Sequence, residues 1–224
     1  MSVGQDWRRY AAEFLGTALL LTAVVGSGIM GDRLAEGNVA IALLANSIAT
    51  GAALVVLIAT FAPISGAHFN PAVSIAEAWR GRLPWALVAG YVVMQCLGAV
   101  AGVVATHVMF NEPLVALSHH GRTGIGQIVS ESVATFGLLL VIFGSTRRSS
   151  ETVAAFVGLY IASAYWFTSS TSFANPAVTL ARVLTDTFAG IALTSVPGFL
   201  AAQLFGAIAA VIVCRWLWPD ARPL

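Results

Sequence analysis

Six apolar runs, each about as long as a bilayer is thick, constrain this chain more than any other feature. A spanning helix needs about 20 predominantly apolar residues. Such runs cover residues 10–30, 39–61, 84–109, 124–145, 152–168 and 193–217. Charged residues make up 9% of the 224 residues, against roughly 25% in a soluble domain. The sequence therefore predicts an all-α protein with six transmembrane helices.

The arginines predict how these spans are oriented. If the N-terminus is cytoplasmic, three arginines (Arg33, Arg122 and Arg182) lie outside the cell. The other eight then lie on the cytoplasmic side: Arg8, Arg9, Arg80, Arg82, Arg147, Arg148, Arg215 and Arg222. Cytoplasmic loops carry an excess of basic residues, so we expect a multi-pass protein of the cell's inner (plasma) membrane with both termini in the cytoplasm. The net charge of +1 leaves no basic patch for nucleic acid.

Two of the connections, 62–83 and 169–192, are too apolar to be ordinary loops. The piece from Pro71 to Trp79 is about 14 Å long as a helix at 1.5 Å per residue, about half the thickness of a hydrocarbon core. Irregular backbone at membrane depth is tolerated only where it is buried in protein or lines a wet cavity. We therefore expect two re-entrant half-helices.

The two halves of the chain, about 1–115 and 116–224, repeat each other. Three echoes occur in the same order: Asn70-Pro71-Ala72-Val73 with Asn175-Pro176-Ala177-Val178, Glu13 with Glu131, and Gln95 with Gln203. Each half holds three full spans, an odd number, so the second half starts from the opposite membrane face. We therefore expect a single domain made of inverted repeats, an arrangement that places a site near the membrane midplane.

Each Asn-Pro-Ala motif predicts a helix that starts at mid-membrane. Asn is a strong N-cap residue and Pro suits the first helical position, and a helix N-terminus carries roughly +0.5 of an elementary charge. Two such ends facing each other would repel cations and protons. The Asn70 and Asn175 amides would donate to a passing acceptor, and extended backbone before each motif, including Gly66, Ala67 and His68, would present carbonyls to the conduit.

The sequence from Ser65 to Val73 and the second Asn-Pro-Ala motif resemble the major intrinsic protein family, the aquaporins and aquaglyceroporins. The resemblance covers essentially the whole chain and implies one pore per subunit, normally in a homotetramer. It also implies a selectivity filter at Thr50, Ser163, Ser172 and Val178, with Phe173 replacing Ser172 if the loop differs by one residue. The family usually has Arg where this chain has Val178. Arg182 is expected at the exposed end of the second half-helix, within reach of Asp186.

A filter of small residues without a fixed charge implies a pore wider than a water channel. Glycerol, urea and undissociated metalloid acids such as arsenite, with methylated arsenicals as a further class, are the expected solutes. The Val resembles a bacterial subgroup associated with arsenic resistance. Three alternatives remain at this point: a strictly water-selective pore, a proton-coupled transporter that uses Glu13 and Glu131, and a non-conducting structural membrane protein.

The remaining polar residues suggest no further chemistry. Carboxylates inside a membrane are expensive and usually functional, but the pairing of Glu13 with Glu131 favours a structural role, in which each accepts hydrogen bonds from the loop of its own half. His119 and His120 form too weak a pattern for a metal site. No nucleophile and base occur together, so we expect no enzyme activity, metal or cofactor.

Overall fold

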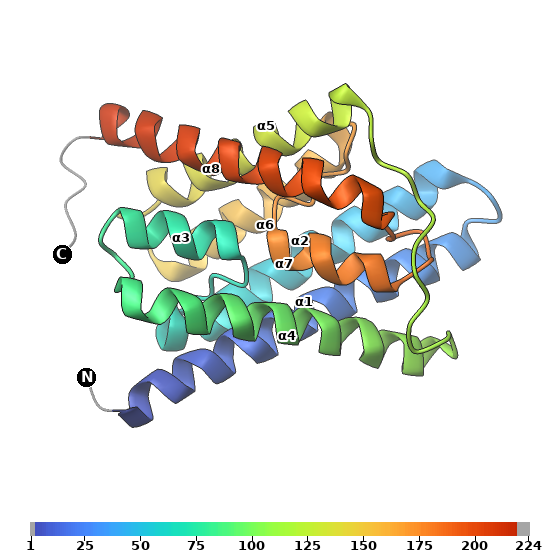
Figure 1. Ribbon diagram of the computed structural model, residues 1–224, viewed down its shortest axis with the longest axis horizontal. Coiled ribbons are helices and arrows are strands. Elements are labelled where there is room, and N and C mark those ends of the chain that lie inside the picture. The colour runs from blue at the N-terminus through green and yellow to red at the C-terminus, as the bar shows by residue number, and fades with distance from the viewer. Residues whose placement is uncertain (1–2, 219–224) are drawn as a thin grey trace.

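The computed structural model describes residues 3–218, so Arg222 of the orientation count lies outside the described residues. Within that range the chain is all-helical, with six long helices packed around two short ones (Figure 1). The long helices are α1 (Val3–Leu34), α2 (Val39–Ser65), α4 (Trp85–Phe110), α5 (Ile125–Gly144), α6 (Ser150–Phe167) and α8 (Val196–Leu217). The short ones are α3 (Pro71–Trp79) and α7 (Pro176–Ala181), with the 3-10 turns η1 (Arg182–Leu184) and η2 (Leu193–Ser195).

The predicted spans agree with the helices to within four residues at every end but one. The exception is α1, which begins at Val3 rather than at residue 10. A helix continues beyond its apolar stretch where a charged side chain stabilises its terminus. Asp6 lies in the first turn of α1 and opposes the positive end of the helix dipole. The predicted fold class is therefore confirmed.

Five of the described helices are long and apolar enough to cross a membrane. The sixth long helix, α6, is long enough with 18 residues but is not among them, because its polar start at Ser150, Glu151 and Thr152 makes it less apolar. At 1.5 Å per residue it is about 27 Å long, close to the thickness of a hydrocarbon core.

The helix pairs of the first half recur in the second. Helix α1 packs against α4 and α2, as α5 packs against α8 and α6, while α2 against α6 joins the two halves. The short helices pack across the halves, α3 on α8 and α7 on α4, and their N-terminal ends meet in the middle of the bundle. We call the end of the bundle where α1 begins and α8 ends the terminal end, and the opposite one the loop end (Figure 1).

Two glycines let the paired helices approach closely, one in each half. A Cβ at Gly98 would lie 2.3 Å from the carbonyl oxygen of Phe14, and one at Gly206 would lie 2.4 Å from that of Ser132. Both obstacles are helix backbone, which cannot rotate away. The α1–α4 and α5–α8 crossings therefore depend on the missing side chains.

We expect Gly98→Ala to destabilise the protein although Ala is the better helix former. The helices must separate, and overpacking of this kind costs about 1–3 kcal/mol. Gly26→Ala is the matched control, because its Cβ would meet nothing closer than 3.4 Å, on the Phe110 ring. Thermal unfolding in detergent measures both variants. Equal melting temperatures for the two would show that the close approach does not matter.

Candidate functional site

The two short helices begin at the Asn-Pro-Ala motifs, with equivalent caps. The side-chain oxygen of Asn70 accepts a hydrogen bond from the Ala72 N–H at 2.9 Å. That of Asn175 accepts from the Ala177 and Val178 N–H groups at 3.0 and 3.3 Å. Pro71 and Pro176 follow their caps, at positions where a helix needs no N–H. Both caps are buried, so the positive ends of two helix dipoles lie inside the molecule.

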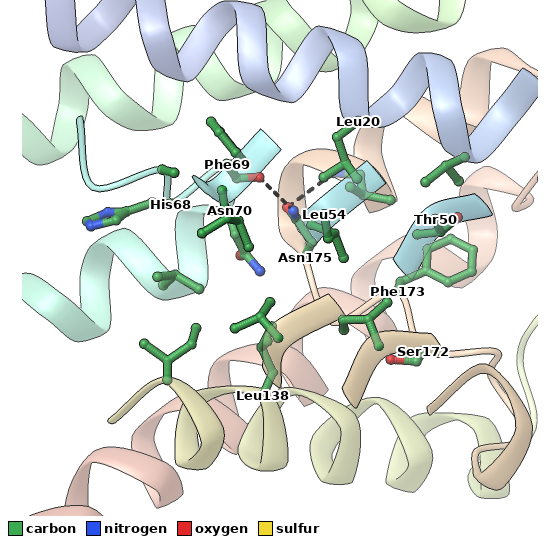
Figure 2. A pocket seen from close by; sticks show the side chains of 18 of the residues that line it. Leu20, Thr50, Leu54, His68, Phe69, Asn70, Leu138, Ser172, Phe173 and Asn175 are labelled. Carbon is green, nitrogen blue, oxygen red and sulfur yellow. Dashed lines mark hydrogen bonds between the residues drawn. The ribbon is translucent and has the colours of Figure 1, made fainter. Parts of the chain in front are cut away.

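The amide nitrogens of the two caps hold the tips together. Asn70 Nδ2 donates to the Ala174 carbonyl at 2.8 Å. Asn175 Nδ2 donates to the Phe69 carbonyl at 2.7 Å, and Figure 2 shows this second bond. Each cap thus bonds the residue that precedes the other cap. A carboxamide NH₂ carries two hydrogens, so one donor of each Asn is used here and the second is left for the cavity that both side chains line.

The sequence predicts extended backbone before each cap, but several residues of these loops lie in the left-handed region. Ala67 and Phe69 have φ values of 51° and 50°, and Ser172 and Ala174, 105 positions later, have 51° and 49°; Thr171 has 61°. The left-handed region costs a residue with a Cβ roughly 1–2 kcal/mol. The expectation was wrong because these loops follow the geometry of their hydrogen-bond partners, two buried carboxylates.

Glu13 in α1 accepts four hydrogen bonds, which organise the first loop. Its donors are the Ser65 hydroxyl at 2.6 Å, the His68 and Phe69 N–H groups at 3.0 and 2.7 Å, and Gln95 Nε2 at 2.8 Å. The side chain has no exposed surface. Its two oxygens therefore satisfy two backbone donors that the left-handed turns leave without a helix or sheet partner.

Glu131 in α5 accepts the equivalent hydrogen bonds in the second half and organises the second loop. It accepts from the Ser170 hydroxyl at 2.6 Å, the Phe173 and Ala174 N–H groups at 2.8 and 2.9 Å, and Gln203 Nε2 at 2.7 Å. It too is fully buried. Each carboxylate is held by the loop of its own half, and neither lines the cavity between the halves.

A cavity of about 300 Å³ runs past the two tips. At the terminal end it is lined by Glu77 and Arg82, and then by Gly66, Ala67 and His68. Asn70 and Asn175 lie in its middle, and Thr50, Ser172 and Phe173 lie at its other end (Figure 2). The remaining wall is largely aliphatic, with Leu20, Val24, Leu54, Leu138, Val157 and Ile161.

Three of the four predicted filter residues line the loop end of this cavity: Thr50, Ser172 and Val178. Ser163 does not; it is exposed, and its hydroxyl donates to the Tyr160 carbonyl of its own helix at 2.7 Å. The α6 residue on this wall is Tyr165, whose hydroxyl lies 3.2 Å from Thr50 Oγ1. The prediction that Ser163 belongs to the filter was therefore wrong, because α6 is rotated so that Tyr165 faces the cavity instead.

A sequence signal for Tyr165 was present. Val157, Ile161 and Tyr165 recur every four residues and form one buried row that lines the cavity. Side chains four apart share a helix face, whereas Ser163 falls between these positions. The second loop supplies both candidates for the fourth position, since Ser172 and Phe173 are both buried and both line the cavity.

The exposed position expected for Arg182 was also wrong. Its side chain is 2% exposed, its Nε donates to the Ala189 carbonyl, and its guanidinium carbon lies 3.5 Å above the Phe173 ring centroid. It makes no ion pair with Asp186, which instead accepts from the His119 N–H at 2.9 Å. The chain after η1 folds back over Arg182 and covers it, which the length of the short helix could not reveal.

The histidine pair contributes backbone contacts. The His120 N–H donates to Ser118 Oγ at 3.2 Å, and its carbonyl accepts from the Ala192 N–H at 2.7 Å. Over residues 3–218, no three His, Cys, Asp or Glu side chains lie close enough to hold a metal ion.

Comparison with known proteins agrees with this geometry. A model of the major intrinsic protein family matches residues 1–169. Aquaglyceroporin AqpS of Rhizobium meliloti is 54% identical over 217 residues, covering 97% of this chain and 93% of the relative. Aquaporin Z of Rhodopseudomonas palustris is 29% identical over 227 residues, covering 95% and 94%. The crystal structure of the aquaglyceroporin from Plasmodium falciparum has the same fold, with a TM-score of 0.76, 20% identity and 96% of both chains covered. This chain thus belongs to the major intrinsic protein family and is a membrane channel, not an enzyme.

Proposed function

We propose that this channel passively conducts small uncharged solutes: water, glycerol, urea and metalloid acids such as arsenous acid, with methylated arsenicals as a further class. The observation that carries the proposal is the cavity that runs from Glu77 and Arg82, between Asn70 and Asn175, to Thr50 and Val178. Solutes would follow their own gradient, since nothing in the sequence suggests an energy-coupling motif.

Exclusion of protons and cations follows from the middle of this path. Two helix N-termini meet there, each with a partial positive charge of roughly half a proton. The second amide hydrogens of Asn70 and Asn175 donate to a passing oxygen. A water oxygen that accepts both cannot relay a proton along a hydrogen-bonded chain, and low-dielectric aliphatic walls on either side strengthen the barrier.

Passage of solutes larger than water is supported by Val178. An arginine side chain at that position would reach across the cavity and fill part of it, whereas the isopropyl group of Val leaves that volume open and apolar. AqpS, at 54% identity, is described as an aquaglyceroporin, which favours the same class of solute here. The link to arsenic compounds rests on the Val itself.

A water-selective pore is the second candidate, and Tyr165 and Phe173 favour it. Both aromatic side chains line the end of the cavity, where a filter of Thr50, Ser163, Ser172 and Val178 would present only small residues. If their rings set the narrowest point, the loss of an arginine at position 178 would not widen the pore enough for glycerol. The choice between the two candidates therefore depends on how far these two rings narrow the path of the solute.

A proton-coupled transporter has less support. Glu13 and Glu131 each accept four hydrogen bonds and face their loops instead of the cavity. A proton relay needs a carboxyl group that the transported proton can reach. We propose that both carboxylates are structural.

The assembly and its orientation complete the proposal. Large apolar side chains cover the outside of the bundle, including Leu15 in α1, Ile48 in α2, Leu97 in α4, Val129 in α5 and Phe205 in α8. Lipid and neighbouring subunits would cover these faces in a homotetramer of the plasma membrane. The terminal end would be cytoplasmic.

Solute flux into vesicles tests the function. In proteoliposomes followed by stopped-flow light scattering, we expect glycerol and urea to enter faster than in empty vesicles, and arsenous acid uptake to be detected by arsenic content. Tyr165→Ala should raise the glycerol rate because it removes a ring from the wall, while Ser163→Ala should leave it unchanged. Water flux alone would indicate the water-selective pore, loss of uptake with a collapsed proton gradient would indicate a transporter, and no flux at all would indicate a structural protein.

A further inference from the structure

Arg182 lines the pore cavity and has donors that no described residue accepts. Its side chain is 2% exposed, and its Nε is bonded to Ala189, but its two terminal nitrogens make no hydrogen bond with any described residue. Arg182 lines both the pore cavity and a second cavity of about 250 Å³ toward the loop end. It lies four residues after Val178, and side chains at that spacing share a helix face.

A second arginine reaches the same place from a different segment. Arg122 belongs to the connection between α4 and α5. Its Nε donates to the Gly190 carbonyl at 3.1 Å and its Nη1 to the Ser170 carbonyl at 3.2 Å. Its guanidinium carbon lies 5.1 Å from the Phe173 ring centroid, against 3.5 Å for Arg182. Both guanidinium groups thus lie near the same aromatic ring, which attracts them through a weak cation–π interaction.

Neither Arg122 nor Arg182 forms an ion pair with a carboxylate of residues 3–218. The ion pair Arg33–Glu112 is the one found among residues 3–218. The charge of Glu131 favours the protonated form of Arg122, but the Glu131 oxygens already accept four hydrogen bonds from the second loop and Gln203. Burial lowers the pKa of the Arg122 guanidinium below its usual value, yet arginine stays protonated in proteins. One buried and one half-buried positive charge therefore lie near a single carboxylate whose oxygens are already bonded.

The second cavity has an apolar side, with Val39, Leu43 and Phe188, and a polar side that carries the two arginines. Besides Arg122 and Arg182, its wall includes Asn46, His120, Gln127 and Thr171. Buried charge without a partner is expensive, and an oxyanion is the ligand whose geometry matches the planar fork of guanidinium donors. A tetrahedral or planar oxyanion is far smaller than 250 Å³.

We propose that Arg182 and Arg122 form a binding site for small oxyanions at the loop end of the pore. The site restores, one helical turn farther out and from outside the motif, a positive charge that Val178 does not supply. Weak oxyacids, whose anions the site binds at the mouth of the pore, then join the solutes that the channel conducts. This consequence for transport rests on the proposed function.

Binding of inorganic phosphate to the purified full-length protein tests the site without any flux measurement. In detergent at pH 6, we expect sodium phosphate to raise the melting temperature in a saturable way, beyond sodium chloride at equal ionic strength. Arg182→Met, which keeps the length of the side chain, should weaken phosphate binding at least about tenfold, since it removes a charge-assisted contact. Arg182→Lys should fall between the two, because it keeps the charge without the fork.

Arg148→Met is the matched control, since it removes an exposed arginine between α5 and α6; its phosphate affinity should stay within about twofold, as for other surface changes. No saturable effect of phosphate on the wild type would overturn the site, as would unchanged affinity in folded Arg182→Met. If that variant does not fold, the Lys variant and the wild-type titration decide. Glycerol flux is measured on the same preparations: phosphate binding without flux would contradict the proposed function alone, and flux without phosphate binding would contradict the site alone.

Discussion

Arginine in place of Val178 is expected to cut glycerol flux at least about tenfold while reducing water flux much less. A tenfold change corresponds to about 1.4 kcal/mol in the barrier. The reason is volume and charge together: residue 178 is 5% exposed in the wall of the cavity that Thr50 and Tyr165 also line, and a long guanidinium there would occupy the path of a solute. Water, being smaller and a good acceptor, would still pass.

Paired glycerol and water permeabilities of the same vesicles measure this effect, with the ratio as the readout. Val178→Leu is the control for bulk without charge and should change the ratio less. A second expectation concerns Arg182, one turn away: the new guanidinium would face a like charge, so some loss of stability is expected and is measured by thermal unfolding. An unchanged ratio in a folded Val178→Arg channel would show that residue 178 is not at the constriction.

Leucine in place of Glu13 is expected to abolish the folded channel. The substitution leaves the Ser65 hydroxyl, the His68 and Phe69 N–H groups and Gln95 without their acceptor in a fully buried place. Each unsatisfied buried group costs about 1–3 kcal/mol, and the left-handed turns at Ala67 and Phe69 lose the contacts that hold them. The total approaches the whole stability of a typical protein, about 5–15 kcal/mol.

Recovery of monodisperse protein after detergent extraction, followed by size-exclusion chromatography, measures the loss. Glu131→Leu should behave in the same way, because its four donors are equivalent. Glu151→Leu removes an exposed carboxylate from the first turn of α6 and should cost at most about 1 kcal/mol. A well-folded Glu13→Leu protein that has lost uptake would contradict the structural role and favour the transporter.

The features that could be predicted from the sequence are those with a local cause. Apolar runs, an Asn cap and a Pro at the first helical position act within a few residues, and they placed α3 and α7 without knowledge of the packing. The echoes of Glu13 in Glu131 and of Gln95 in Gln203 indicated matching environments in the two halves. The hydrogen bonds of both carboxylates to their loops have that matching pattern.

The errors concern residues whose surroundings come from distant segments. Ser163 and Tyr165 lie on the same helix, and only the packing of α6 against α2 decides which of them faces Thr50. Arg182 follows a helix of six residues. Its burial depends on the later segment around Ala189, which folds back over it and accepts its hydrogen bond. The left-handed residues before each cap follow from carboxylates on other helices.

The sequence alone therefore determined that this chain spans a membrane, that two half-helices start inside it, and that its halves repeat, because helix starts and apolar length are local properties. The tertiary structure alone decided which side chains line the mouth of the pore and where its positive charge lies. Those outcomes depend on helix rotation and on loops that close over them, and both are set by contacts between residues far apart in the chain.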